Sequence, residues 1–223
     1  MSDLGSRVLP FVETESETES GWGHDGVWAE PLRLPMIVSD EVAELSAHFG
    51  EPVQRTFQVQ ADDYIYSYRF KQEQDRRAEV VFAIEDEAGH FWVHSKAHYP
   101  SHIYRLPTGG IEWHELVVDG LLREVKEETG QSAEIVRFLG IIDYEFCHGA
   151  LTVPFVSYIF HLRAACPGCP PIQKGEPISE FRAVRPKQIR QLADNLRGLA
   201  GVRRAWGEWR ALAHDLVYDT LLH

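Results

Sequence analysis

The sequence has few cysteines, a deficit of basic residues and no long apolar run. Its 223 residues contain three cysteines, which is too few to predict a disulfide scaffold. No stretch of about 18 apolar residues occurs, so we expect no membrane-spanning helix. The opening residues lack the basic start and apolar centre of a signal peptide, and we therefore expect a cytoplasmic protein.

Acidic residues outnumber basic residues in this chain. There are 34 Asp and Glu residues against 22 Lys and Arg residues, which gives a formal net charge of −12. This balance excludes long-range attraction to nucleic acid or to an anionic membrane as the main driving force of binding. The surplus of carboxylates serves either solubility or a cation-binding site, depending on whether the acids cluster.

The N-terminal part predicts an arm followed by a small extension. Residues 1–30 are acidic and rich in Ser and Thr, then rich in Gly, which predicts a flexible acidic arm. Residues 31–76 form the predicted extension, with a helix at 39–49 that Ser39 caps and Gly50 ends. The extension also contains two β-rich runs joined by a polar turn, which predict a β-hairpin. The two runs are residues 53–59 and 63–70.

We expect the main domain over residues 77–223. Hydrophobic residues make up 44% of the chain, enough for a globular core. Two β-rich runs, 78–84 and 90–96, flank a turn and predict a second hairpin. Strands and helices do not alternate regularly, which favours a mixed α/β sheet over a doubly wound one. Further strands are expected at 133–142, 150–162 and 178–184, and helices at 186–196 and 202–222.

Three carboxylates share one face of a helix that is expected to end at Gly130. At about 100° per residue, Glu124, Glu127 and Glu128 fall within an arc of about 100° that borders the apolar stripe. Their repulsion is therefore worse than on a solvated face, and a hard divalent cation would offset it. Gly120 lies on the same face, where glycine lets another group approach the helix closely. The alternative is a solvated charged helix stabilised by ion pairs.

The residues before this helix carry a family resemblance. Gly109 is followed after five residues by Glu115 and, after seven more, by the run from Arg123 to Gly130. This pattern resembles the Nudix box. Eight of its nine constrained positions match, and the ninth, normally aliphatic, is Gln131. The resemblance implies a strand–loop–helix–loop unit within a Nudix-type α/β/α sandwich that spans about 77–196, with a C-terminal helix beyond it.

The resemblance also implies an activity. Nudix hydrolases cleave a nucleoside diphosphate linked to another group with Mg²⁺ or Mn²⁺, so we expect a small, nucleotide-type substrate. It implies a role for Arg123, which orients the acidic cluster by an ion pair. It further implies catalytic roles for Glu124 and Glu127, and it places the metal ion among a larger set of residues. That set is Glu124, Glu127 and Glu128, the supporting Glu115, and a loop carbonyl at Thr108 or Gly109.

Further residues are candidates for proton transfer and substrate binding. The general base is either Glu124 or an acid near the strand at 178–184, where Glu176 and Glu180 are both candidates. A phosphate-binding role suits the positive charge of Arg105 and Lys96. Tyr104 is a candidate for stacking on a base, although an aromatic residue is more often part of the core.

Two other sets of residues have metal-ligand spacing. His90, His94, His98 and His102 recur every four residues, but Gly89, Pro100 and the β-rich residues between them oppose a continuous helix. Cys166 and Cys169 form a single CxxC pattern without a second pair, so a tight turn with free thiols is favoured over zinc.

The C-terminal part leaves two alternative functions open. From Arg182 to Arg210 there are eight basic residues and two acidic residues. They could make the chain a ligand-sensing Nudix-like regulator that binds DNA. We favour the interpretation that these basic residues balance the negative charge of the rest of the chain, or that they pair with acidic residues across the interface of a homodimer. An isomerase of isoprenoid diphosphates also has the Nudix fold, but this function would require Cys147 in the site.

Overall fold

The computed structural model describes residues 34–70, 76–100, 102–168, 170–173, 175 and 177–222. The chain divides into two compact units, Met1–Glu30 and Pro31–His223, and all described residues belong to the second. The arm predicted at 1–30 therefore lies outside the described residues. The extension predicted at 31–76 belongs to the same compact unit as residues 77–223.

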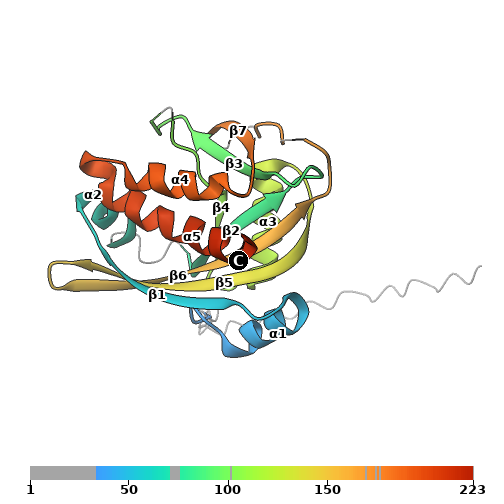
Figure 1. The fold of residues 1–223 in the computed structure, drawn as a ribbon. Helices are drawn as coiled ribbons and strands as arrows, with labels where there is room; N and C mark the ends of the chain where they lie inside the picture. The colour runs from blue at the N-terminus through green and yellow to red at the C-terminus, as the bar shows by residue number, and fades with distance from the viewer. Residues whose placement is uncertain are drawn as a thin grey trace, which may run out of the picture. The chain divides into compact units, whose positions relative to one another are not determined.

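Seven strands of the described part form one mixed sheet, in the order β1-β5-β6-β2-β3-β7, with β4 paired to β2 (Figure 1). The pairs β1/β5 and β2/β6 are parallel and the others are antiparallel. The predicted mixed sheet and the hairpin of β2 and β3 are thus confirmed. The strands are β1 Val53–Gln60, β2 Ala78–Glu85, β3 Phe91–Lys96, β4 Thr108–Ile111, β5 Ala133–His148, β6 Leu151–Ala164 and β7 Ile178–Val184.

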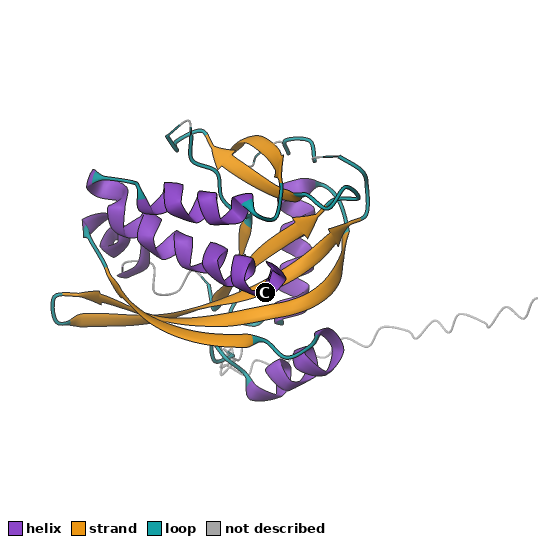
Figure 2. Cartoon of the chain, in the orientation of Figure 1, coloured by secondary structure: helices purple, strands orange, loops and turns teal. Residues whose placement is uncertain are grey.

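Helices cover both faces of this sheet (Figure 2). One buried cluster joins the sheet to α4 and α5 through Leu192 and Trp209, and a second joins it to α1 and α3 through Leu45 and Leu121. The resulting three layers are the predicted α/β/α sandwich. In the described part, no helix has both the length and the apolar character that a membrane crossing requires. The helical elements are α1 Ser39–Phe49, α2 Asp63–Ile65, η1 Tyr66–Phe70, α3 Val117–Thr129, α4 Gln188–Arg197, η2 Gly201–Arg203 and α5 Arg204–Leu222.

The second half of the predicted N-terminal hairpin is wrong. β1 pairs in parallel with β5, with Val53 opposite Gly140, whereas residues 63–70 form α2 and the π-helical turn η1. The Asp62 carboxylate accepts a hydrogen bond from the N–H of Ile65 at 3.0 Å and so begins the helix. Burial of Ile65 in the cluster beneath α5 then outweighs the β-rich composition of the run.

Helix α1 forms where it was predicted, but its N-cap is Val38, so the prediction of Ser39 as the cap is wrong. Gly50 ends the helix with a φ of 89°. One side chain of α1 also supports α3, because Glu41 Oε1 accepts the N–H of Val117 at 2.6 Å. Its second oxygen, Oε2, accepts Nη2 of the wholly buried Arg77 at 2.8 Å. Glu41 therefore caps a helix that begins 76 residues later in the sequence.

Candidate active site

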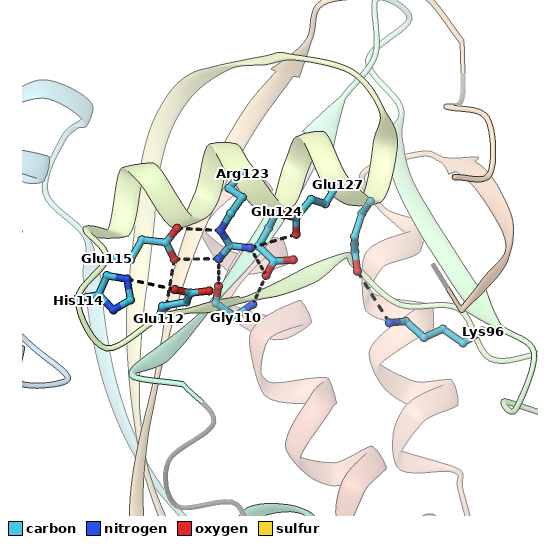
Figure 3. Close-up of polar contacts among 9 residues, drawn as sticks. Lys96, Gly110, Glu112, His114, Glu115, Arg123, Glu124 and Glu127 are labelled. Atoms are coloured by element: carbon cyan, nitrogen blue, oxygen red, sulfur yellow. Dashed lines mark hydrogen bonds and ion pairs between the residues drawn. The ribbon is translucent and has the colours of Figure 1, made fainter. Parts of the chain in front are cut away.

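Arg123 lies at the centre of the unit formed by β4 and α3 (Figure 3). Its Nε and Nη2 donate to the two oxygens of Glu115, both at 2.8 Å. Its Nη1 donates to Glu124 at 2.9 Å and to Glu127 at 3.1 Å, and its Nη2 also donates to the carbonyl of Gly110 at 2.8 Å. One planar guanidinium thus fixes three carboxylates relative to β4.

Glu115 approaches α3 closely and faces Arg123. Partial burial opposes its ionisation, but hydrogen bonds from Arg123 and from the N–H of Glu112 lower the pKa of the Glu115 carboxyl. A Cβ atom at Gly120 would lie 2.9 Å from Glu115 Oε2. The expectation that Gly120 admits another group is therefore confirmed, and the group is the Glu115 carboxylate. Both Glu115 oxygens accept hydrogen bonds from Arg123, so Glu115 acts on the site by holding Arg123 in place.

Glu124 lies directly over β4. Its Oε1 accepts the N–H of Gly110 at 2.9 Å. A Cβ atom at Gly109 would overlap the Glu124 side chain, so only glycine allows this packing. Burial raises the pKa of the Glu124 carboxyl, and the hydrogen bond and charge of Arg123 offset only part of this effect. The site therefore favours additional positive charge beside Glu124.

Glu127 and Glu128, the two acidic residues at the end of α3, differ in exposure. The Glu127 side chain is 50% exposed, whereas Glu128 is buried at 3% and faces β3. Lys96 Nζ lies 3.9 Å from Glu128 Oε1, and His94 Nδ1 lies 3.8 Å from Glu128 Oε2. Burial, followed by the positive charges of Arg105 and Lys96, lowers the pKa of His94 well below its usual range. The ring is therefore neutral at pH 7.

An open pocket of about 340 Å³ lies against these residues. It combines carboxylates, among them Glu124 and Glu128, with three positively charged side chains, Arg76, Lys96 and Arg123. Such a mixture suits a phosphate group bound together with a cation. The sequence pattern did not indicate Arg76, which lies in the polar segment before β2 and has no motif around it. The lining residues are Arg76, Lys96, Thr108, Gly109, Gly110, Ile111, Glu112, Arg123, Glu124, Glu128 and Pro177.

The donor set fits a hard divalent cation. Carboxylate and carbonyl oxygens are the ligands that Mg²⁺ prefers, and Gly109 provides the room in which Glu124 meets the backbone of β4. Within the described ranges, no three acidic, His or Cys side chains already converge as a metal site. Arg123 occupies one oxygen each of Glu124 and Glu127. Their other oxygens are the groups that would turn toward a metal ion.

The structure does not bring all the predicted substrate-binding residues to this pocket. Lys96 lines it, but Arg105 is buried on the side of α5 and donates to the Tyr99 hydroxyl at 3.0 Å and to Thr108 Oγ1 at 3.0 Å. The Tyr104 hydroxyl donates to Glu180 at 2.6 Å. Neither Arg105 nor Tyr104 is among the lining residues. Glu176, a candidate general base, lies outside the described residues.

The other candidate metal ligands are dispersed. His90, His94, His98 and His102 lie on β3 and the turns around it, so the helical arrangement that their spacing could have produced is absent from this described segment. Cys166 is a free, exposed thiol, and Cys169 lies outside the described residues. Cys147, near the end of β5, does not line the pocket, which removes support for the isomerase alternative.

Several basic residues of the C-terminal part pair with acids of the same chain, which agrees with charge balance. Arg210 Nη1 donates to both oxygens of the buried Glu79 at 2.8 Å. Asp215 accepts from Arg190 and from Arg197. These pairs give no support to a DNA-facing surface.

Comparison with known proteins identifies the family. A family model described as NUDIX domain matches residues 74–204, more than half of the chain. No curated protein sequence matches the chain.

Several solved structures show a partial likeness to this chain, all at low identity. The E. coli dihydroneopterin triphosphate pyrophosphohydrolase is 13% identical over 60% of this chain and 94% of its own, with a TM-score of 0.41. An ADP-ribose pyrophosphatase from Streptococcus suis is 17% identical over 66% of this chain and 92% of its own, with a TM-score of 0.40. A NUDIX hydrolase from Nitrosomonas europaea is 19% identical over 61% and 89%, with a TM-score of 0.41.

The matched segment contains the whole pattern from Gly109 to Gln131, which the structure builds as β4, the following loop and α3. The chain belongs to the NUDIX domain family and is a hydrolase acting on pyrophosphate bonds.

Proposed function

We propose that the chain uses a divalent metal ion, Mg²⁺ or Mn²⁺, to hydrolyse the diphosphate bond of a nucleoside diphosphate linked to another group. The observation that carries this proposal is the pocket that both Glu124 and Glu128 and the basic side chains of Lys96 and Arg76 line. Binding of a diphosphate bridge requires both acidic and basic side chains. The carboxylates bind the metal ion, and the basic side chains contact the phosphate oxygens that the ion does not neutralise.

The carboxylates of α3 would hold the metal ion, with Glu124, Glu127 and Glu128 as ligands and a carbonyl of β4 at Thr108 or Gly109 completing the set. When bound, the ion neutralises phosphate oxygens and lowers the pKa of a water molecule. Arg123 keeps Glu124 and Glu127 oriented through its hydrogen bonds at 2.9 and 3.1 Å. Phosphoryl transfer depends mainly on such positioning.

Proton transfer falls to Glu124 in this proposal. Burial raises the pKa of this carboxyl, which makes it a better proton acceptor than an exposed glutamate. Oε1 is held by the N–H of Gly110 and by Arg123, so Oε2 is the remaining oxygen, and its two lone pairs would serve the metal ion and the proton of the attacking water. Lys96 would balance the negative charge that gathers on the phosphate oxygens.

A hydrolysis screen with a matched pair of variants tests this function. The protein is assayed with Mg²⁺ or Mn²⁺ against ADP-ribose, a dinucleoside polyphosphate, a nucleotide sugar, NADH and nucleoside triphosphates, with identification of the bond that is cut. Glu124→Gln should lower kcat by at least about 100-fold, because it removes both a metal ligand and the proton acceptor. Glu134→Gln, on an exposed position of β5, should retain full activity.

Activity that survives a metal chelator would contradict the metal requirement. Equal kcat values for Glu124→Gln and the unaltered protein would contradict the assignment of Glu124. Turnover of none of the diphosphate compounds would contradict the substrate class.

A further inference from the structure

His94 is a buried polar side chain to which the proposed reaction assigns no role. It lies on β3 and is wholly buried. Neither of its ring nitrogens has a hydrogen-bond partner among the described residues. Leaving a buried polar group unsatisfied costs about 1–3 kcal/mol, so such a group in a native protein calls for an explanation.

The ring of His94 lies behind Glu128. Side chains alternate along a strand, so His94 and Lys96 project from the same face of β3. His94 Nδ1 is 3.8 Å from Glu128 Oε2 and Lys96 Nζ is 3.9 Å from Glu128 Oε1. Each distance is about 1 Å longer than a usual N–H···O hydrogen bond. A small rotation of the Glu128 carboxylate would bring one of its oxygens within hydrogen-bond distance.

The backbone holds His94 in this place. The N–H of His94 donates to the carbonyl of Arg105 at 2.9 Å, and the N–H of Arg105 donates back at 3.0 Å. The backbone of His94 therefore cannot shift away from α3 without breaking this pair of hydrogen bonds, and its ring is wholly buried. Any adjustment that completes the hydrogen bond falls to Glu128, whose side chain is longer and rotates about more bonds.

We propose that His94 is a positioning residue for Glu128, which it holds by an Nδ1–H hydrogen bond to Oε2 when that carboxylate binds the divalent ion. The inference rests on the proposed function, because it requires the metal ion. A neutral imidazole has one N–H to donate. It suits this place because a second positive charge beside Lys96 would repel the cation. Donors behind metal ligands fix the orientation of those ligands, and losing one weakens metal binding by about 10–100-fold.

The test measures Mn²⁺ binding to the full chain by titration calorimetry without substrate. His94→Phe removes the N–H and retains a planar ring, and His94→Asn retains a donor near the position of Nδ1. We expect His94→Phe to raise the Mn²⁺ dissociation constant by about 10-fold or more, and His94→Asn to restore most of the affinity. His161→Phe is the matched control, because His161 is also buried on a strand but bonds to Glu85, and it should bind Mn²⁺ as the unaltered protein does.

Urea unfolding of each variant separates metal binding from folding. His94→Phe should be at least as stable as the unaltered protein, since it removes an unsatisfied buried group. If it does not fold, His94→Leu provides the same loss of the donor. Unchanged Mn²⁺ affinity in the folded Phe or Leu variant would overturn the role of His94 and leave the proposed function standing. Equal weakening in the Asn and Phe variants would overturn it as well. Failure of the unaltered protein to bind Mn²⁺ would overturn the metal site itself.

Discussion

The guanidinium of Arg123 shows how one residue orients three of the carboxylates at the site. It binds Glu115 through two parallel hydrogen bonds and still reaches Glu124 and Glu127. Lysine carries the same charge but has no planar fork, so it could not hold these groups in one geometry. The orientation of the carboxylates therefore depends on the shape of Arg123 as well as on its charge.

Gly109 gives the first prediction at the residue scale. In Gly109→Ala the new methyl group overlaps the Glu124 side chain. Glu124 must move away from β4, and a displacement of about 1 Å in such a site costs on the order of 100-fold in kcat/KM. Steady-state kinetics with Mg²⁺ measures the effect. Gly198→Ala is the control, because its Cβ atom would only reach Asn195 O at an ordinary 3.4 Å. Equal kcat/KM values for both variants would show that the close packing at Gly109 is unimportant.

Local spacing predicted some of these residues and not others. Helical periodicity placed Glu124, Glu127 and Glu128 on one face because the period depends only on near neighbours. Their different exposure could not be predicted, because Glu128 is buried by β3, a segment distant in the sequence. Arg105 was expected at the site because it precedes the box closely, but its side chain lies on the side of α5.

At the element scale, α1 and α3 depend on each other through Glu41. The N-cap position of α3 is Leu116, whose side chain cannot accept a hydrogen bond. Glu41 supplies an oxygen to the N–H of Val117 instead, and it neutralises Arg77 at the same time. Nothing in the local pattern of α1 distinguishes Glu41 from Asp40 or Glu44. The sequence therefore predicted the helix but not its contact.

Replacing Glu41 gives the second prediction. Glu41→Ala should lower the free energy of unfolding by about 3 kcal/mol, because it leaves the buried Arg77 without its carboxylate. Urea denaturation at pH 7 measures the change. Glu44→Ala, an exposed position on the same helix, should change the free energy of unfolding by less than about 0.5 kcal/mol. A loss of the same size in both variants would contradict the link between Glu41 and Arg77.

The segment after β1 has the composition of a strand but does not form one. Residues 63–70 are rich in Tyr and Ile, which favour strands, and yet they form α2 and η1. The Asp62 cap and the burial of Ile65 beneath α5 decide the outcome. The cap is visible in the sequence, whereas the burial requires α5, which lies about 140 residues further on. For β2, β3, β5, β6 and β7, β-rich runs in the sequence were sufficient, whereas β4 was implied only by the family resemblance.

At the scale of the whole molecule, buried histidines tie stability to pH. His214 on α5 accepts the N–H of Leu106 at Nε2, 2.9 Å away, and its Nδ1 lies 2.8 Å from the carbonyl of Arg210. Burial lowers the pKa of His214 to about 4. Burial also lowers the pKa of His94 well below its usual range. Both rings must stay neutral in the folded protein.

The third prediction follows from these shifts. An unfolded histidine binds a proton below about pH 6.5, whereas folded His214 does so only near pH 4, so protonation stabilises the unfolded state in between. The free energy of unfolding should be full above pH 6.5 and fall as the pH drops toward 4, by about 3 kcal/mol for His214 alone. Urea denaturation between pH 7.5 and 4.5 measures the profile. His214→Gln should flatten it, and the exposed His48→Gln should leave it unchanged. A slope that His214→Gln leaves intact would contradict this origin.

The contacts of α1 and β1 determine where this protein can be divided. The family likeness begins at residue 74, but β1 covers the edge of β5 from Val53 to Gln60 and Glu41 caps α3. A fragment cut at residue 74 would present an unpaired strand edge, the kind of surface from which proteins aggregate. It would also retain Arg77 without its counter-ion. The smallest piece that could be transplanted intact therefore starts ahead of α1, and the boundary of likeness is not the boundary of the folding unit.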